Sequence, residues 1–320
     1  MRLGYLALRI VQFLGVLLVL SFLVFSLLGL VPGDLVKILI GTRRVTPEIR
    51  ATITEKYRLD DPIPVRYAHW LADAVHGDFG ESVRSGTSVA SVVGARLPLT
   101  LSLTLLAFVL ALAVGIPLGI ASARRIGTAL DRQIVIWSVV GVSAPGFALG
   151  MLLLYVFAVM LRWFPLYGAG EGLLDSLWHL ALPALALAVG TAAVIIRITR
   201  ASVARELEQD YVTFARSRGL NPRRIARMYV RNASIPILTS AGLILGSLFG
   251  STVLVEEAFS LPGLGQLLAD SITFKDVPVV QAIALLVAVV IITATFVVDL
   301  VAAWIDPTQR LGENHSGVRA

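Results

Sequence analysis

Six long apolar runs dominate this sequence and limit what it can fold into. The runs are roughly Leu6–Val31, Leu97–Ala121, Ile134–Leu161, Leu180–Ile198, Ile235–Val255 and Val277–Trp304. Each has or exceeds the roughly 20 residues that a helix needs to cross a hydrocarbon layer about 30 Å thick. Because this layer offers no water to the backbone, such runs must be helical. We therefore predict an all-α integral membrane protein with six transmembrane helices.

The composition excludes an ordinary water-soluble fold. Hydrophobic residues make up 57% of the chain and charged residues 15%, with a mean hydropathy of +0.83, whereas soluble domains carry about 25% charged residues. The net charge of +6 would suggest nucleic acid in a soluble protein, but in a membrane protein Lys and Arg set the orientation. We expect no nucleic-acid partner. Cysteine is absent, which rules out disulfides and cysteine-ligated metal.

The distribution of basic residues predicts the orientation in the membrane. The short segment 124–132 carries three arginines against one acid, and the segment 197–231 carries nine arginines against three acids, whereas the alternate loops are poor in basic residues. The positive-inside rule then places both termini in the cytoplasm. The first apolar run is longer than a signal-peptide core and ends in Pro32-Gly33 without a small-x-small cleavage site. We expect it to be retained as the first membrane helix.

The organisation that follows has three parts. Residues 1–31 form the N-terminus and first helix, residues 32–96 a small extracytoplasmic domain, and residues 97–320 the remaining five helices, a cytoplasmic loop at about 201–234 and a short cytoplasmic tail. Within the extracytoplasmic domain, Thr46 followed by Pro47 predicts a helix start. A second helix is predicted from Val65 to about Val75.

Catalytic signals are missing from the sequence. No phosphate-binding G-x-x-x-x-G-K-[ST] loop is present, the four histidines lack metal-ligand spacing, and Ser143 and Ser247 have no base nearby in sequence. We expect no catalytic, cofactor-binding or metal-binding residues in this chain. The apolar runs are almost free of charge, with Arg197 and Asp299 near helix ends. This disfavours a carrier driven by a proton or sodium gradient.

Small residues and prolines mark points where the helices pack or bend. Gly242, Gly246 and Gly250 recur every four residues beside Ser247, which predicts close helix packing, and the same face could also line a moving pathway. Three prolines lie inside apolar runs and are expected to kink or unwind their helices: Pro117, Pro145 and Pro183.

The cytoplasmic loop is the most informative stretch. We predict a helix over Glu206–Ser217 closed by Gly219, and a second helix capped by Asn221 with Pro222 at its first position. The second helix carries a basic stripe and an apolar patch, formed by Arg223, Arg227 and Arg231 and by Ile225, Met228 and Tyr229. Such a helix could lie on anionic lipid or dock into a groove of a cytoplasmic partner.

The loop resembles the EAA loop of binding-protein-dependent ABC importers, in the version of the dipeptide/oligopeptide/nickel permease family. The matching residues are Asp210-Tyr211-Val212-Thr213-Phe214-Ala215-Arg216-Ser217-Arg218-Gly219-Leu220, then Arg231-Asn232-Ala233 and Pro236. Thr213 stands where the family's glutamate lies, and Phe214 departs from the usual small or polar residue. Ala215 and Gly219 match the pattern.

The resemblance extends over about 270 residues. Its further elements are Pro32-Gly33-Asp34, Tyr67, Trp70, Gly77-Asp78-Phe79-Gly80, Ser82, Leu97-Pro98-Leu99-Thr100-Leu101, Glu256, Phe259, Pro262-Gly263-Leu264-Gly265, Asp276-Val277-Pro278 and Asp306-Pro307. Each element is weak alone, but their order and spacing make the match specific. The large domain between the first two helices is similar to that of B-type permeases.

The resemblance implies a type I importer fold with the loop acting as coupling helix. The residues implied for contact with an ATPase are Asp210, Thr213, Ala215, Arg216, Gly219, Leu220, Asn221 and Arg223, and an outer loop is formed by Glu256, Phe259, Pro262, Gly263 and Gly265. The implied partners are a second, related permease, two ATP-binding subunits that hold ATP and magnesium, an extracytoplasmic binding protein and the lipid bilayer of a bacterial or archaeal cell membrane.

The function implied is half of a translocation pathway for dipeptides and oligopeptides, working by alternating access, with no enzymatic activity in this chain. Importers of nickel chelates, glutathione or haem share the scaffold and stay open as alternatives. A gradient-driven carrier is the alternative from a different class.

Overall fold

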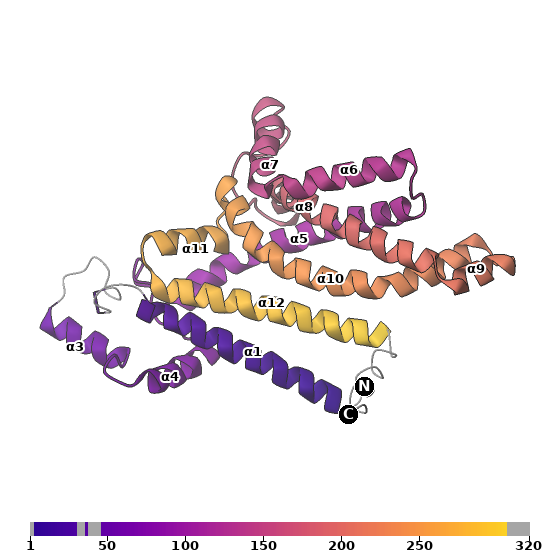
Figure 1. Ribbon diagram of the computed structural model, residues 1–320. Helices are drawn as coiled ribbons and strands as arrows, with labels where there is room; N and C mark the ends of the chain where they lie inside the picture. Colours follow the sequence, from indigo (N-terminus) through magenta and orange to yellow (C-terminus); the bar gives the residue numbers. More distant parts are fainter. Residues whose placement is uncertain (1–2, 31–35, 38–45, 306–320) are drawn as a thin grey trace. The chain divides into compact units, whose positions relative to one another are not determined.

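The computed structural model describes residues 3–30, 36–37 and 46–305 (Figure 1). The chain divides into two compact units, each made of two chain segments. The first unit contains residues 1–102 and 260–292, and the second contains residues 103–259 and 293–320. The described residues are almost entirely helical, and their one extended pairing is an isolated bridge between Glu81 and Ser88.

The first unit is built from the helices nearest the two ends of the chain. It contains α1 (Leu3–Leu30), α3 (Pro47–Lys56), α4 (Ile63–Val75), the first part of α5 (Val89–Ala123), α11 (Leu264–Thr273) and the first part of α12 (Val277–Ile305). The predicted start of α3 is confirmed, because the Thr46 hydroxyl accepts a hydrogen bond from the Ile49 amide at 3.3 Å. The predicted helix at Val65–Val75 is also present and begins two residues earlier.

Two features hold the first unit together. Val89 and Val93 of α5 pack with Leu264 of α11 and with Ile283 of α12 in one buried apolar cluster. The Gln281 amide donates to the carbonyls of Val24 and Phe25, at 3.2 and 3.1 Å, which ties α12 to the last turns of α1.

A buried carboxylate links the two chain segments of the first unit. Both carboxylate oxygens of Asp276, which is 2% exposed, accept hydrogen bonds from the segment 82–84. The Ser82 hydroxyl donates at 2.5 Å, the Val83 amide at 3.1 Å and the Arg84 amide at 3.3 Å. A charged acceptor makes stronger hydrogen bonds than a neutral one, so this carboxylate fixes the chain before α5 to the turn before α12.

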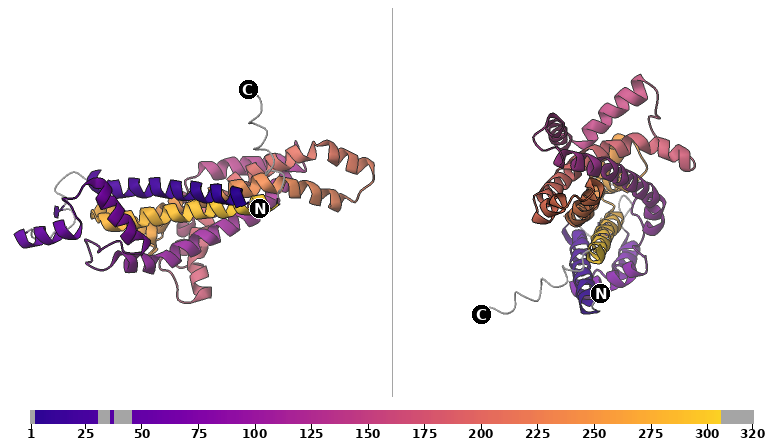
Figure 2. Two further views of the ribbon diagram at one scale, coloured as in Figure 1. Left: turned by 90° about the horizontal axis from the view of Figure 1, so that it is seen from below. Right: turned by 90° about the vertical axis from the view of Figure 1, so that its right-hand side faces the viewer.

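The second unit contains the remaining helices, which follow each other through short connections. They are the rest of α5, α6 (Ala129–Ser143), α7 (Gly146–Leu153), the π-helix η1 (Leu154–Met160), α8 (Leu173–Leu207), α9 (Asp210–Ser217), α10 (Pro222–Ala258) and the end of α12. In Figures 1 and 2, α8 and α10 run side by side and the short α9 lies at one end of this pair.

Among the described residues, four helices are long and apolar enough to cross a membrane. They are α5, α8, α10 and α12 over its part Val277–Val298. The pair of α6 with α7 and η1 makes a fifth span if it counts as one. In α1 the apolar helical part Ile10–Ser26 is shorter than that length. The membrane fold is thus confirmed, while the six crossings stay a prediction.

Of the three prolines expected to disturb helices, Pro145 produces a break. It lies between α6 and α7, which are bent by 98°. The helices α5 and α8 continue through Pro117 and Pro183 without unwinding, and a kink at these two positions stays a prediction. The run Ile134–Leu161 is interrupted at the expected proline, because Ala144 adopts an extended conformation ahead of it.

Glycines allow close helix contacts in the second unit, but partly at other positions than predicted. A Cβ atom on Gly115 would lie 2.7 Å from Ile195, and one on Gly119 would lie 2.6 Å from Thr199, so α5 approaches α8 closely. Gly242 has the same property against Val298, at 2.9 Å. A Cβ atom on Gly250 would meet nothing within 4 Å, so this position does not pack in the way the repeat suggested.

Candidate functional site

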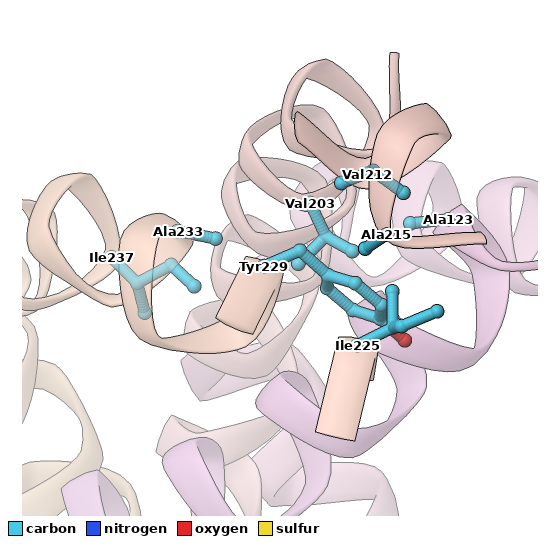
Figure 3. Close-up of a cluster of buried hydrophobic side chains, with 8 residues drawn as sticks. All are labelled: Ala123, Val203, Val212, Ala215, Ile225, Tyr229, Ala233 and Ile237. Carbon is cyan, nitrogen blue, oxygen red and sulfur yellow. The ribbon is translucent and has the colours of Figure 1, made fainter. Parts of the chain in front are cut away.

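The turn formed by α8, α9 and α10 is the candidate site, and a buried apolar cluster supports it. Figure 3 shows the cluster, in which Val203 of α8 and Val212 of α9 point toward Tyr229 and Ile225 of α10. Ala123 at the end of α5 completes one side. Because α9 has only eight residues, it is too short to be stable alone. Its position therefore depends on this cluster.

The start of α9 differs from the prediction. Glu206 and Leu207 still belong to α8. The helix is interrupted at Glu208–Gln209, where the backbone of Gln209 is extended. The predicted helix over Glu206–Ser217 was therefore wrong in its first turn. Asp210 becomes the first residue of α9, where its negative charge interacts favourably with the positive end of the helix dipole.

The end of α9 depends on Gly219, as its position in the sequence suggested. Gly219 has a φ of +70°, which glycine adopts more easily than other residues. Its amide donates to the Arg216 carbonyl at 2.9 Å, and the Leu220 amide donates to the Ala215 carbonyl at 3.2 Å. This pair of bonds is a Schellman motif, and it satisfies carbonyls that the helix end would leave free.

The next helix begins immediately afterwards. The Asn221 side chain accepts a hydrogen bond from the Arg223 amide at 2.9 Å, with Pro222 at the first helical position, as predicted. The helix does not end in the loop. It continues through Pro236 to Ala258, so the turn is continuous with a helix long and apolar enough to cross a membrane.

The exposed face of the turn is basic with apolar side chains between the charges. The predicted arginine stripe at 223, 227 and 231 is exposed. Of the predicted apolar patch, only Met228 is exposed, at 37%. Ile225 and Tyr229 are buried in the cluster instead, so the expectation of a surface patch formed by all three was wrong. Phe214, which is 59% exposed with the Arg218 guanidinium 4.4 Å above its ring, adds apolar surface.

The remaining residues implied by the resemblance occupy two environments. Asp210, Thr213, Arg216 and Asn221 are exposed on the turn. Ala215 is buried, and Leu220 is half-buried against the cluster.

A buried ion pair links the turn to the neighbouring helices, and sequence reasoning missed it. Asp131 of α6 is 4% exposed. The Arg200 guanidinium of α8 donates to both of its oxygens, at 2.7 and 2.9 Å. The Ser122 hydroxyl of α5 and the Gly127 amide also donate to this carboxylate. One carboxylate thus joins three helices close to the start of the turn. In the sequence, Asp131 entered the argument only as the single acid of the basic segment 124–132.

A second polar contact lies at the break between α8 and α9. The Tyr211 hydroxyl donates to a Glu206 carboxylate oxygen at 2.6 Å. Burial, together with the neighbouring Glu206 carboxylate, raises the pKa of Tyr211 to about 12. The contact stabilises the interruption between the two helices, because it joins the last turn of α8 to the first turn of α9.

The two other groups of predicted residues lie elsewhere in the fold. In α10, Gly242 and Gly246 are buried, whereas Ser247 and Gly250 are exposed. Of the outer-loop residues, Glu256 and Phe259 are buried in the second unit, and Phe259 lies against Gly150. In the first unit Pro262 is exposed, while Gly263 and Gly265 are buried at the start of α11.

Some predicted residues cannot be placed. Pro32-Gly33-Asp34 and Asp306-Pro307 lie outside the described residues, as does the side chain of Asp299. Arg197 is exposed.

Family models match the chain over nearly its whole length. Residues 115–311 match the model for the inner membrane component of binding-protein-dependent transport systems, and residues 2–104 match the model for the N-terminal part of such membrane components.

Curated relatives match over almost the entire chain. A probable peptide ABC transporter permease of Sinorhizobium fredii is 35% identical over 96% of this chain and 99% of its own length. An oligopeptide transport system permease of Bacillus subtilis is 36% identical, over 95% and 98%. A glutathione transport system permease of Escherichia coli K12 is 39% identical, over 96% and 99%.

Solved structures resemble the fold. The MetNI methionine ABC transporter in an inward-facing conformation has a chain that aligns with a TM-score of 0.56 at 20% identity, over 67% of this chain and 96% of that one. A chain of an amino acid ABC transporter aligns with a TM-score of 0.53 at 18% identity, over 67% and 94%.

Proposed function

This chain belongs to the family of binding-protein-dependent transport system inner membrane components, and from this premise we propose that it is a permease subunit of an ATP-driven importer of dipeptides and oligopeptides. The observation that carries the substrate class is the match with two peptide permeases over at least 95% of this chain. The glutathione permease matches equally well and is itself named for a small peptide.

The α8–α9–α10 turn is proposed as the coupling element. A partner that moves α9 also moves the buried cluster beneath it, because Val212 and Ala215 are part of that cluster. The displacement then reaches α8 through Val203 and α10 through Tyr229, and both helices are long enough to cross the membrane. Asp131 and Arg200 resist sliding of α8 against α6, so the elements respond together.

The proposed partners follow from the family and from the surface of the turn. Two ATP-binding subunits would bind ATP and magnesium, and one would accept α9 in a groove that offers acidic side chains to Arg216, Arg223 and Arg227. A second, related permease would complete the pathway, and an extracytoplasmic binding protein would deliver peptide. With six crossings, both termini are cytoplasmic and residues 32–96 form the extracytoplasmic domain of a bacterial or archaeal cell membrane protein.

The function is tested by reconstituting the permease in lipid with its co-encoded proteins and measuring ATP hydrolysis. Stimulation that requires both the binding protein and a dipeptide or oligopeptide is the expected result. Stimulation by glutathione, nickel chelates or haem in place of longer peptides would keep the architecture and replace the substrate. Transport that persists without ATP and without an associated ATPase would favour a gradient-driven carrier and contradict the proposal.

The docking surface is tested separately with two matched aromatic residues. Phe214 is 59% exposed with an arginine 4.4 Å above its ring, and Phe274 of the first unit is 54% exposed with Arg84 at 4.1 Å. We expect Phe214→Ser to reduce co-purification of the ATPase about tenfold, in the range of an aromatic hot spot. Phe274→Ser should leave co-purification unchanged. Equal effects of the two variants would contradict docking on α9.

A further inference from the structure

A cavity of about 210 Å³ lies within the first unit, between α4 and the adjoining ends of α1 and α12. Its apolar wall includes Phe25 of α1, Trp70 of α4 and Pro278 of α12. Its polar wall carries charges of both signs, from Arg58, Arg66, Asp73 and Asp78. The mixture of an apolar wall with a few charged groups is typical of a small-molecule or headgroup site.

Arg66 lines this cavity, and its side chain has one unused donor. Its Nε is buried and has no hydrogen-bond acceptor among the described residues. Its guanidinium lies 5.9 Å from the centre of the Phe25 ring. A buried donor without an acceptor is rare in proteins, because it loses its hydration without compensation. An anion in the cavity would lie beside this side chain and balance its charge.

Arg58 lines the same cavity and follows the C-cap residue of α3. Its φ of +50° ends that helix in a Schellman motif, in which the Arg58 amide donates to the Glu55 carbonyl at 3.2 Å and the Leu59 amide to the Thr54 carbonyl at 2.9 Å. The Arg58 guanidinium donates to Nε2 of His69 at 2.6 Å, and His69 also lines the cavity. This bond requires a neutral imidazole with Nε2 as the acceptor. Two arginines therefore share one small cavity, an arrangement that an anion would stabilise.

The position of the cavity indicates where such an anion comes from. Phe25 lies at the end of the apolar part of α1, and Pro278 lies in the first turn of the apolar helix α12. The rings of Tyr67 and Trp70 of α4 pack at a tilt against Phe25, with centroids 5.6 and 5.7 Å from it. Tyrosine and tryptophan gather where membrane meets water. With the membrane crossings proposed above, the cavity is expected at the level of lipid headgroups.

The surface beside the cavity suits acyl chains. On α1, Leu18, Val19 and Phe22 are exposed, at 54%, 59% and 41%. They lie on the turns that precede Phe25, so an acyl chain that follows α1 would lead its headgroup to the cavity. A free phosphate would make no use of this apolar surface or of the aromatic wall.

We propose that the cavity binds the headgroup of a zwitterionic phospholipid of the ethanolamine type. The phosphate would accept hydrogen bonds from Arg58 and Arg66, and the ammonium group would face Asp73 and Asp78. An anionic lipid without an amine would leave the two carboxylates uncompensated. The site would therefore prefer phosphatidylethanolamine over phosphatidylglycerol.

Native mass spectrometry of the full-length chain in mild detergent tests this proposal, with the two phospholipids added at equal concentrations. We expect the wild type to retain one phosphatidylethanolamine in preference to phosphatidylglycerol. Arg66→Gln should lower this retention about tenfold, because it removes a charge-assisted hydrogen bond. Arg84→Gln is the matched control, since Arg84 is an exposed arginine of the same unit paired with Asp270, and it should retain the lipid.

Two further measurements keep the proposal open to refutation if Arg66→Gln folds poorly. In the wild type, soluble glycerophosphoethanolamine should displace the lipid at lower concentration than inorganic phosphate. Asp73→Asn combined with Asp78→Asn should abolish the preference for ethanolamine while phosphatidylglycerol still binds. Equal retention by Arg66→Gln and the wild type would overturn the proposal. Displacement by inorganic phosphate as readily as by the headgroup would also overturn it, because it would indicate a simple anion site.

Discussion

The ion pair between Asp131 and Arg200 allows a quantitative prediction. Asp131→Ala leaves the Arg200 guanidinium without its counter-charge in a largely buried position, with side chains 6% and 30% exposed for Asp131 and Arg200. Removing one partner of a buried pair costs about 3–5 kcal/mol. Because Arg200 keeps contact with solvent, we expect the lower end of this range, about 3 kcal/mol.

The chain contains a matched pair for comparison. Arg84 and Asp270 lie 3.2 Å apart, and their side chains are 54% and 51% exposed. Exposed pairs contribute about 0.2–1 kcal/mol. The two pairs use the same types of side chain at similar distances, so burial and the number of hydrogen bonds are their principal differences.

Double-mutant cycles to alanine on both pairs measure the difference. The free energy of unfolding would be followed by circular dichroism in mixed micelles with increasing dodecyl sulfate. The single and the double Asp131 variants both lose the hydrogen bonds from Ser122 and Gly127, so this loss cancels in the coupling energy. We expect a coupling energy of about 2 kcal/mol for the buried pair and less than about 1 kcal/mol for the exposed pair. Equal coupling energies would refute the reasoning that burial makes the pair strong.

Three other predictions follow from single positions. Gly219→Val should abolish stimulation of the ATPase in the reconstituted complex, because a β-branched residue at a φ of +70° costs more than about 1 kcal/mol. Gly219→Asn should retain the stimulation. Full stimulation of the valine variant would contradict the role of the α8–α9–α10 turn as the coupling element. Gly119→Ala should lower the unfolding midpoint in dodecyl sulfate because its Cβ would lie 2.6 Å from Thr199, whereas Gly250→Ala, with nothing within 4 Å, should not; similar midpoints would contradict the close contact. Wild-type stability should fall as the pH rises from about 10 to about 12, because the unfolded chain releases the Tyr211 proton at its ordinary pKa while the folded chain keeps it. In a plot of melting temperature against pH, Tyr211→Phe should lose less stability over this range than the wild type. Identical profiles would exclude Tyr211 as the cause.

Local signals in the sequence were sufficient for helix ends and for the apolar helices. Thr46, Gly219 and Asn221 have the structures predicted for them, because each acts on backbone groups within a few residues. Four predicted membrane helices are present for a similar reason, since about 20 apolar residues in a row identify a span without knowledge of its neighbours. The break at Pro145 was also predicted locally.

Features that depend on distant residues were not predicted. Asp131 and Arg200 are 69 positions apart, and no periodic pattern connects them. Ile225 and Tyr229 carry a surface-like pattern, but residues of α8 and α9 cover them, which only the folded chain shows. The tight glycine contacts of α5 were missed because Gly115 and Gly119 look like the other small residues of an apolar run.

The carboxylate of Asp276 has a consequence for the order in which this protein is made. It binds the hydroxyl of Ser82, which is synthesised 194 residues earlier. At about 5–20 residues per second, translation of the intervening chain takes about 10–40 s. During that time the segment around Ser82 has left the ribosome without its partner. The first unit is therefore completed only when the last apolar helix arrives, and a chain terminated before Asp276 should leave this segment open to proteases.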